Sequence, residues 1–199
     1  MRSSWLVVCA VLALGSGAAA ADDAFHPVPE SPGLELRLVS YGQGVHGEMV
    51  VEVRNQGSAS AAFVASGLYF TPDGNDEAQR VGMVGYMRVG SEGAATDAVT
   101  VAAGGVRKVR FDVYCIDEHR SAPAMSQAFT LASARMPRAL RDALVERTAG
   151  YVAQLRKQPV ADVTSLIQSE VWGARRQVKV RLQGERRERN APVSAGRGR

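Results

Sequence analysis

Cysteine is scarce in this chain of 199 residues, which contains only Cys9 and Cys115. Cys9 lies in an N-terminal segment that has the features of a removable leader, so the rest of the chain holds one cysteine. A single cysteine cannot form an internal disulfide, even in an oxidising compartment. Packing, and not covalent cross-linking, must therefore stabilise the fold.

Paired metal ligands are lacking as well. The histidines, which are His26, His46 and His119, show no spacing that is typical of a zinc site. Asp117 and Glu118 directly precede His119 and could supply two or three ligands from one loop, but a solvated acidic loop explains the same residues. The sequence predicts no metal ion and no other cofactor.

Long hydrophobic runs are missing too. The longest, Trp5 to Leu14, is too short to span a bilayer, and we therefore expect no transmembrane segment. It follows one early positive charge, Arg2, and precedes small residues that offer signal-peptidase sites after Ala20 or Ala21. This three-part pattern predicts a cleavable signal peptide over residues 1–21. The mature protein is then exported, either to the periplasm or out of the cell.

Charge is distributed unevenly along the chain. The formal net charge is +4, but the segment from Gly173 to the end carries +7. In an exported protein such a segment would attract an acidic surface, such as lipid headgroups, a cell-envelope polymer or an acidic partner protein. Nucleic acid is not predicted, because no aromatic residues are interleaved to stack on bases. A solvated, disordered end over residues 184–199 explains the composition equally well. The arginines concerned are Arg186, Arg187, Arg189, Arg197 and Arg199.

Short strands separated by turn residues dominate the first part of the mature chain. Residues 22–33, rich in proline, indicate an extended lead-in. Alternating or wholly apolar runs bounded by Gly, Pro and Asn then predict an antiparallel, immunoglobulin-like β-sandwich over residues 34–122, although the usual Cys-Trp-Cys core is absent. The strands are expected at residues 34–38, 49–54, 61–70, 80–89, 98–101 and 106–116.

After Pro123 the composition favours helix, and residues 123–183 are predicted to form a C-terminal extension of about two helices. Pro137 suits a first helical turn, and Asp162 is a good N-cap for a second helix that reaches Trp172. Residues 177–183 alternate between apolar and basic side chains and therefore allow a final strand. The expected fold class is mainly β with an α extension.

Cys115 is the one nucleophile close to a histidine, and an imidazole can activate a thiol. However, Cys115 shares its strand face with Val109, Phe111 and Val113, whereas His119 lies beyond the strand end. A free cysteine in that position behaves as a small hydrophobic residue. The sequence therefore predicts a structural Cys115 and no catalytic constellation.

Two short segments resemble a known family. Tyr114-Cys115-Ile116, followed by Gln168-Ser169-Glu170-Val171-Trp172, is similar to the two motifs of bacterial surface thioester domains. The resemblance implies a bond between the Cys115 thiol and the Gln168 side chain, which could capture a target amine covalently. Glu170 replaces the family's Ala. A simpler interpretation leaves Cys115 in the core and has Trp172 pack a helix onto it.

The order of a β-domain, helices and Gln-x-x-Val-Trp also resembles small uncharacterised exported bacterial proteins, which implies no known activity. We therefore expect an exported, non-catalytic binding or structural module. The alternative is a covalent, thioester-type adhesin domain that uses Cys115 and Gln168.

Overall fold

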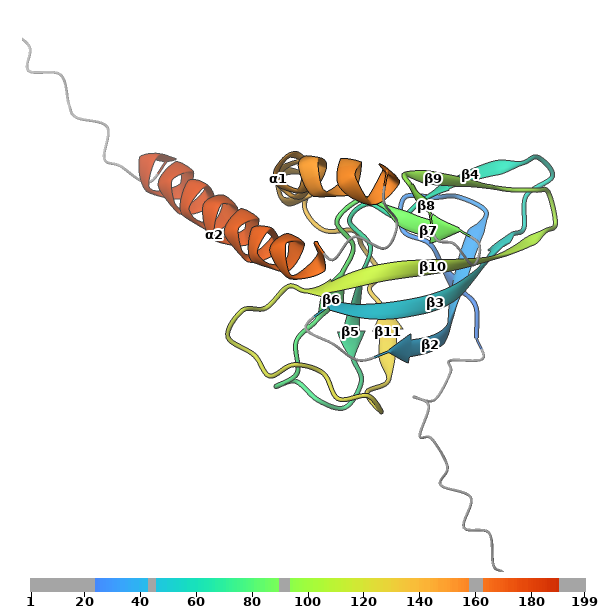
Figure 1. Ribbon diagram of the computed structural model, residues 1–199, viewed down its shortest axis with the longest axis horizontal. Helices are drawn as coiled ribbons and strands as arrows, with labels where there is room; N and C mark the ends of the chain where they lie inside the picture. The colour runs from blue at the N-terminus through green and yellow to red at the C-terminus, as the bar shows by residue number, and fades with distance from the viewer. Residues whose placement is uncertain (1–23, 43–45, 90–93, 158–162, 190–199) are drawn as a thin grey trace, which may run out of the picture.

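The computed structural model describes residues 24–42, 46–89, 94–157 and 163–189 (Figure 1). The predicted signal peptide lies outside these residues. The strands are β1 His26–Pro27, β2 Leu34–Gly42, β3 His46–Asn55, β4 Ala61–Val64, β5 Tyr69–Pro72, β6 Val81–Gly82, β7 Met87–Val89, β8 Ala94–Thr96, β9 Ala98–Val101, β10 Val106–Cys115 and β11 Phe129–Leu131. The helices are α1 Arg138–Lys157 and α2 Thr164–Arg189. The predicted class, mainly β with C-terminal helices, is confirmed.

One large sheet contains nine of the strands, in the order β1-β2-β3-β10-β6-β5-β11, with β7 pairing with both β10 and β8. β4 and β9 form a separate two-stranded sheet, and every strand pair is antiparallel. The large sheet curls, so that β5 and β11 cross behind β3 and β10 (Figure 1). An immunoglobulin-like sandwich of two facing sheets is not confirmed, because nine of the strands belong to one curled sheet. The spacing of strands along the sequence does not determine the order in which they pair.

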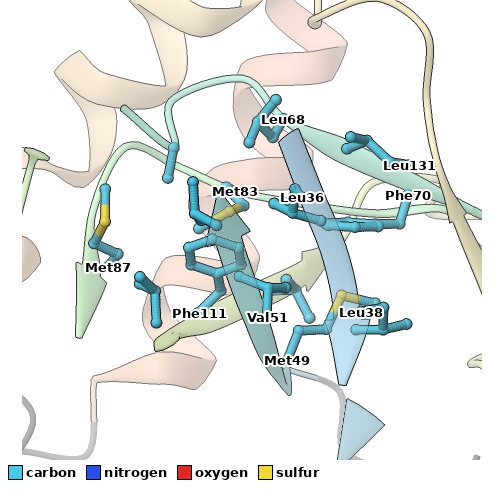
Figure 2. Close-up of a cluster of buried hydrophobic side chains, with 14 of the residues drawn as sticks. Leu36, Leu38, Met49, Val51, Leu68, Phe70, Met83, Met87, Phe111 and Leu131 are labelled. Atoms are coloured by element: carbon cyan, nitrogen blue, oxygen red, sulfur yellow. The ribbon is translucent and has the colours of Figure 1, made fainter. Parts of the chain in front are cut away.

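The first core fills the inside of this curled sheet. On β10 the alternation places Val109, Phe111, Val113 and Cys115 on the inner face, opposite the apolar residues of β3. Figure 2 shows how side chains from β2, β3 and β10 meet those from β5 and β11 there. The members that it labels are Leu36, Leu38, Met49, Val51, Leu68, Phe70, Met83, Met87, Phe111 and Leu131.

The second core lies between the outer face of the sheet and the two helices. Tyr114 and Ile116 of the β10 end face it, and Leu144, Ile167 and Val171 pack there from α1 and α2. The helices therefore cover the sheet with the apolar stripes that their spacing predicts.

A polar network crosses the boundary of the second core. The Tyr86 hydroxyl donates to Asp112 Oδ2 at 2.6 Å and lies 2.7 Å from the Tyr114 hydroxyl, while Arg88 Nε donates to the same carboxylate oxygen at 2.8 Å. Burial is the main cause that raises the pKa of both tyrosines above the usual range. The tyrosines remain neutral donors, and the buried carboxylate is compensated by a guanidinium.

Two expected strands are each divided in two. The run 61–70 becomes β4 and β5, because Gly67 turns the chain at φ 75°; the run 80–89 becomes β6 and β7, with Gly85 at φ 119° between them. Residues other than glycine rarely adopt these φ angles. The aliphatic part of Arg141 also packs directly over Gly67.

Predictions for three parts of the C-terminal region are wrong. Residues 123–137 are not helical; they hold β11, which pairs with β5. Residues 177–183 belong to α2, not to a final strand, because no strand edge is paired with them and Gln, Lys, Arg and Leu favour helix. On this helix Val180 faces solvent, with 69% of its surface exposed. The helix continues to Arg189, so the expected disordered tail does not begin at residue 184.

The Asn55 side chain joins the two sheets by a hydrogen bond from β3 to β9. Its buried amide donates to Ala59 O at 2.8 Å and to Val101 O at 3.0 Å, and it accepts from Gly57 N at 2.9 Å. Asn55→Ala leaves the buried Val101 carbonyl unpaired, and we expect it to lower the free energy of unfolding by about 1–3 kcal/mol in urea denaturation. The control Ser60→Ala, at an exposed position in the same loop, should change it by less than about 0.5 kcal/mol. Equal effects would contradict this role of Asn55.

Candidate functional site

The end of β10 is where the sequence placed the candidate residues, and the structure brings Cys115 and Gln168 together there. Gln168 Oε1 accepts from the Cys115 backbone N–H at 2.9 Å, and Gln168 Nε2 donates to the Cys115 carbonyl at 2.8 Å. Both groups of the Cys115 backbone are therefore bound by one side-chain amide of α2. The Gln168 side chain is itself only 2% exposed.

Strand geometry explains this contact. Ile116 N–H donates to Arg80 O beside β6, so the polar groups of Cys115, one residue earlier, point to the opposite side, where β3 lies. The described register between β3 and β10 extends to the pair of His46 and Tyr114. At the next residue of β10, the Gln168 amide supplies both a donor and an acceptor and so satisfies the buried Cys115 peptide.

The Cys115 thiol belongs to the first core, where the residue is 2% exposed and, among the described residues, is free of any disulfide. Burial, together with the charge of Asp117, raises the pKa of this thiol to about 11. The same interior raises the pKa of Tyr41 to about 12, through burial and then through Cys115. At neutral pH both groups carry their protons and are poor nucleophiles.

Trp172 follows Gln168 by one helical turn and is partly buried against the first core. Its indole Nε1 is buried and finds no hydrogen-bond acceptor among the described residues. A buried donor without a partner costs free energy, and tryptophan N–H groups in such positions usually have one. This donor is one of the features that single out the surface beside it.

That surface is a groove, which is formed by α2, the segment after β10 and the start of α1. Its volume is about 590 Å³. The apolar part consists of Ile116, Pro137, Leu140, Trp172 and Val178. The polar part consists of Asp117, Glu118, His119, Arg120, Arg175, Arg176, Lys179 and Gln183.

The groove is positioned by ion pairs at the β10 end. Arg80 Nη2 and Arg175 Nη1 bind Asp117 Oδ1 at 2.7 and 2.6 Å, and Arg175 also donates to the Ile116 carbonyl. Burial alone would raise the pKa of Asp117, but the hydrogen bonds from both arginines outweigh it and hold that pKa well below its usual range. Asp117 thus stays ionised and ties α2 to the strand end.

The acidic and basic groups of the groove are not balanced. Asp117 is bound by two arginines, and Glu118 is bound by Arg176. Lys179 and His119 have no hydrogen-bond or ion-pair partner within the described part of the chain. Arg120 donates to the Asp76 carbonyl, which carries no charge. The groove therefore has an excess of positive charge with donors still available.

Sequence reasoning missed the groove, although a signal was present. Trp172, Arg176, Lys179 and Gln183 recur at spacings of four, three and four residues, which places them along one side of a helix. The expected final strand over residues 177–183 concealed this pattern.

The other residues that the sequence singled out lie partly within the residues that the structure describes and partly outside them. Arg186, Arg187 and Arg189 lie on the last turns of α2, whereas Arg197 and Arg199 lie outside the described residues. Asp117, Glu118 and His119 line the groove and do not converge: the described residues hold no cluster of three or more metal-ligating side chains. Neither described helix combines the length and hydrophobicity that crossing a bilayer requires.

Comparison of the chain with protein-family models, with curated proteins and with solved structures gave no match. The groove and the Cys115–Gln168 contact are therefore the features that bear on function.

Asp117 predicts a specific dependence of stability on pH. Because its pKa is depressed in the folded state, its contribution to stability is present above the unfolded pKa of about 4 and is lost as the pH falls. We expect Asp117→Asn to remove part of the decline in the free energy of unfolding between about pH 5 and pH 2. Asp97→Asn, which removes an exposed partner of Arg156, is the control and should retain the decline. The same pH profile in both variants would contradict the assignment.

Proposed function

We propose that this protein is an exported, non-catalytic binding module, and that the groove beside Trp172 is its binding surface. The observation that carries the proposal is the groove itself. Its lining combines apolar residues with charged ones, and the positive charges outnumber the negative ones. Ligand sites commonly combine an apolar lining with a few polar groups that orient the ligand. Export is supported by the signal-peptide pattern of residues 1–21.

Binding is favoured over catalysis by the state of Cys115, which is the one thiol of the predicted mature chain. The Cys115 thiol lies in the first core, and His119 lies in the groove, on the segment after the strand end. No hydrogen bond joins these two residues in the part of the chain that the structure describes. A thiol with a raised pKa and no base in contact does not act as an attacking group.

The Trp172 indole provides a direct test of the binding surface. Of the two tryptophans of the chain, Trp5 lies in the predicted signal peptide, so protein that begins at Asp22 has one indole N–H resonance, that of Trp172. We expect this resonance to shift when ¹⁵N-labelled protein is titrated with a panel of anionic, cationic and neutral small amphiphiles. The reason is that a ligand in the groove contacts the indole or pairs with its N–H. A panel in which no compound moves the resonance would refute the groove as a binding surface.

One observation favours a second candidate, the thioester-type adhesin. The Gln168 carboxamide touches the backbone of Cys115, the residue whose thiol that chemistry requires. The Cys115 N–H donates to the amide oxygen and would stabilise negative charge that develops there. Attack of Sγ on the amide carbon would form the S–C bond, break the C–N bond and release ammonia. A target amine would later break the S–C bond, form an amide and return the thiol.

Intact mass separates the two candidates. The non-covalent module has the full mass of its sequence, and Cys115 is alkylated by iodoacetamide once the protein is unfolded. The thioester has a mass lower by one ammonia, and Cys115 resists alkylation in the unfolded protein until an amine is added. Gln168→Glu serves as the control, because its carboxylate cannot form the bond by loss of ammonia. We expect the full mass and one alkylated thiol.

A further inference from the structure

We propose that the ligand of the groove is a single anionic amphiphile, that is, a hydrocarbon chain with a phosphate or carboxylate headgroup. This inference rests on the proposed function, because it assigns a ligand class to the same surface. Four steps support it: the donors that are available, the acceptors that are not, the apolar base, and the shape.

The available donors suit an anion. Lys179 and His119 lie on the groove and have no partner among the described residues, and the Arg120 guanidinium contacts only a neutral carbonyl. Trp172 lines the same groove and contributes an aromatic surface beside these groups. Charge-assisted hydrogen bonds from such groups to a phosphate or carboxylate oxygen are the stronger kind.

The acidic acceptors of the groove are already bound. Asp117 accepts from Arg80 and Arg175, and Glu118 accepts from Arg176. A cationic ligand would therefore meet carboxylates whose charge arginines already compensate. A peptide would bring many backbone N–H groups, each of which needs an acceptor. A headgroup that presents only acceptors matches the groups that remain.

The apolar base suits a hydrocarbon chain. Pro137 and Leu140 lie on the α1 side, Val178 and Trp172 lie on the α2 side, and Ile116 lies at the strand end. Burial of a chain against such a surface is favourable for each methylene group that leaves water. The headgroup alone, without this contribution, is expected to bind weakly.

The shape is elongated. The α2 residues that line the groove run from Trp172 to Gln183, which corresponds to about 16 Å of helix at 1.5 Å per residue. The volume of about 590 Å³ lies within the range of small-molecule sites. One chain can therefore lie along α2 with its headgroup near Lys179.

The test uses the emission of Trp172 in protein that begins at Asp22, in which it is the single tryptophan. Dodecyl phosphate, below its micelle concentration, is expected to shift this emission to the blue, because the chain shields the partly exposed indole from water. Inorganic phosphate tests the headgroup alone, and dodecyltrimethylammonium tests the chain with the opposite charge. Both should bind about tenfold or more weakly, because each lacks one of the two contributions.

Matched variants locate the headgroup. Lys179→Glu should weaken binding of dodecyl phosphate by about tenfold or more, a loss that corresponds to one charged hydrogen bond. Lys108→Glu makes the same charge change at an exposed site near the opposite end of β10 and should leave the affinity unchanged. Far-ultraviolet circular dichroism and melting temperature verify that both variants fold.

Several results would overturn the proposal. Equal binding of the phosphate and the trimethylammonium probes would show that charge does not select the ligand. Equal losses in Lys179→Glu and Lys108→Glu would show that the attraction is not local to the groove. Binding only to phosphatidylglycerol vesicles, and not to monomeric dodecyl phosphate, would assign the surface to a membrane face. If other compounds shift the Trp172 indole resonance and dodecyl phosphate does not, the ligand class is wrong while the binding surface stands.

Discussion

The contact between the Gln168 side chain and the Cys115 backbone is the constraint on which the rest of the site depends. It fixes α2 against the end of β10 through both polar groups of one buried peptide. Arg175, seven residues further along α2, then reaches Asp117 and the Ile116 carbonyl. These two attachments set the distance between the helix and the segment after β10. The groove is the space that they leave, with Trp172 between them along the helix.

Strand positions were predictable because alternation of apolar and polar residues is a local property. The inner face of β10 follows from Val109, Phe111, Val113 and Cys115 alone. Strand order was not predictable, because it depends on turns at residues such as Gly67 that allow β4 and β5 to join different sheets. Residues 177–183 show the limit of local patterns: alternation fits a strand, but only tertiary pairing makes one.

The candidate site was predictable in part, for a similar reason. The thioester resemblance linked Cys115 to Gln168, and the two are in contact, although through a hydrogen-bonded backbone and with the thiol in the first core. The groove needed the structure, because its two walls come from α2 and from the segment after β10. No pattern within either segment shows that Arg175 and Asp117 meet. The basic residues after Gly173 were recognised as a charge excess, but not as one wall of a groove.

The Gln168 amide has a further consequence, which concerns association between molecules. The exposed backbone of a strand that lacks its neighbour is a template on which a strand from another chain can pair. At Cys115, the end of β10, the backbone N–H and carbonyl are instead bound by the Gln168 side chain. A side-chain amide, unlike a strand, has no further row of backbone groups with which another strand could pair. At this one peptide of β10, both hydrogen-bonding groups are therefore occupied from within the molecule, and neither is offered to another chain.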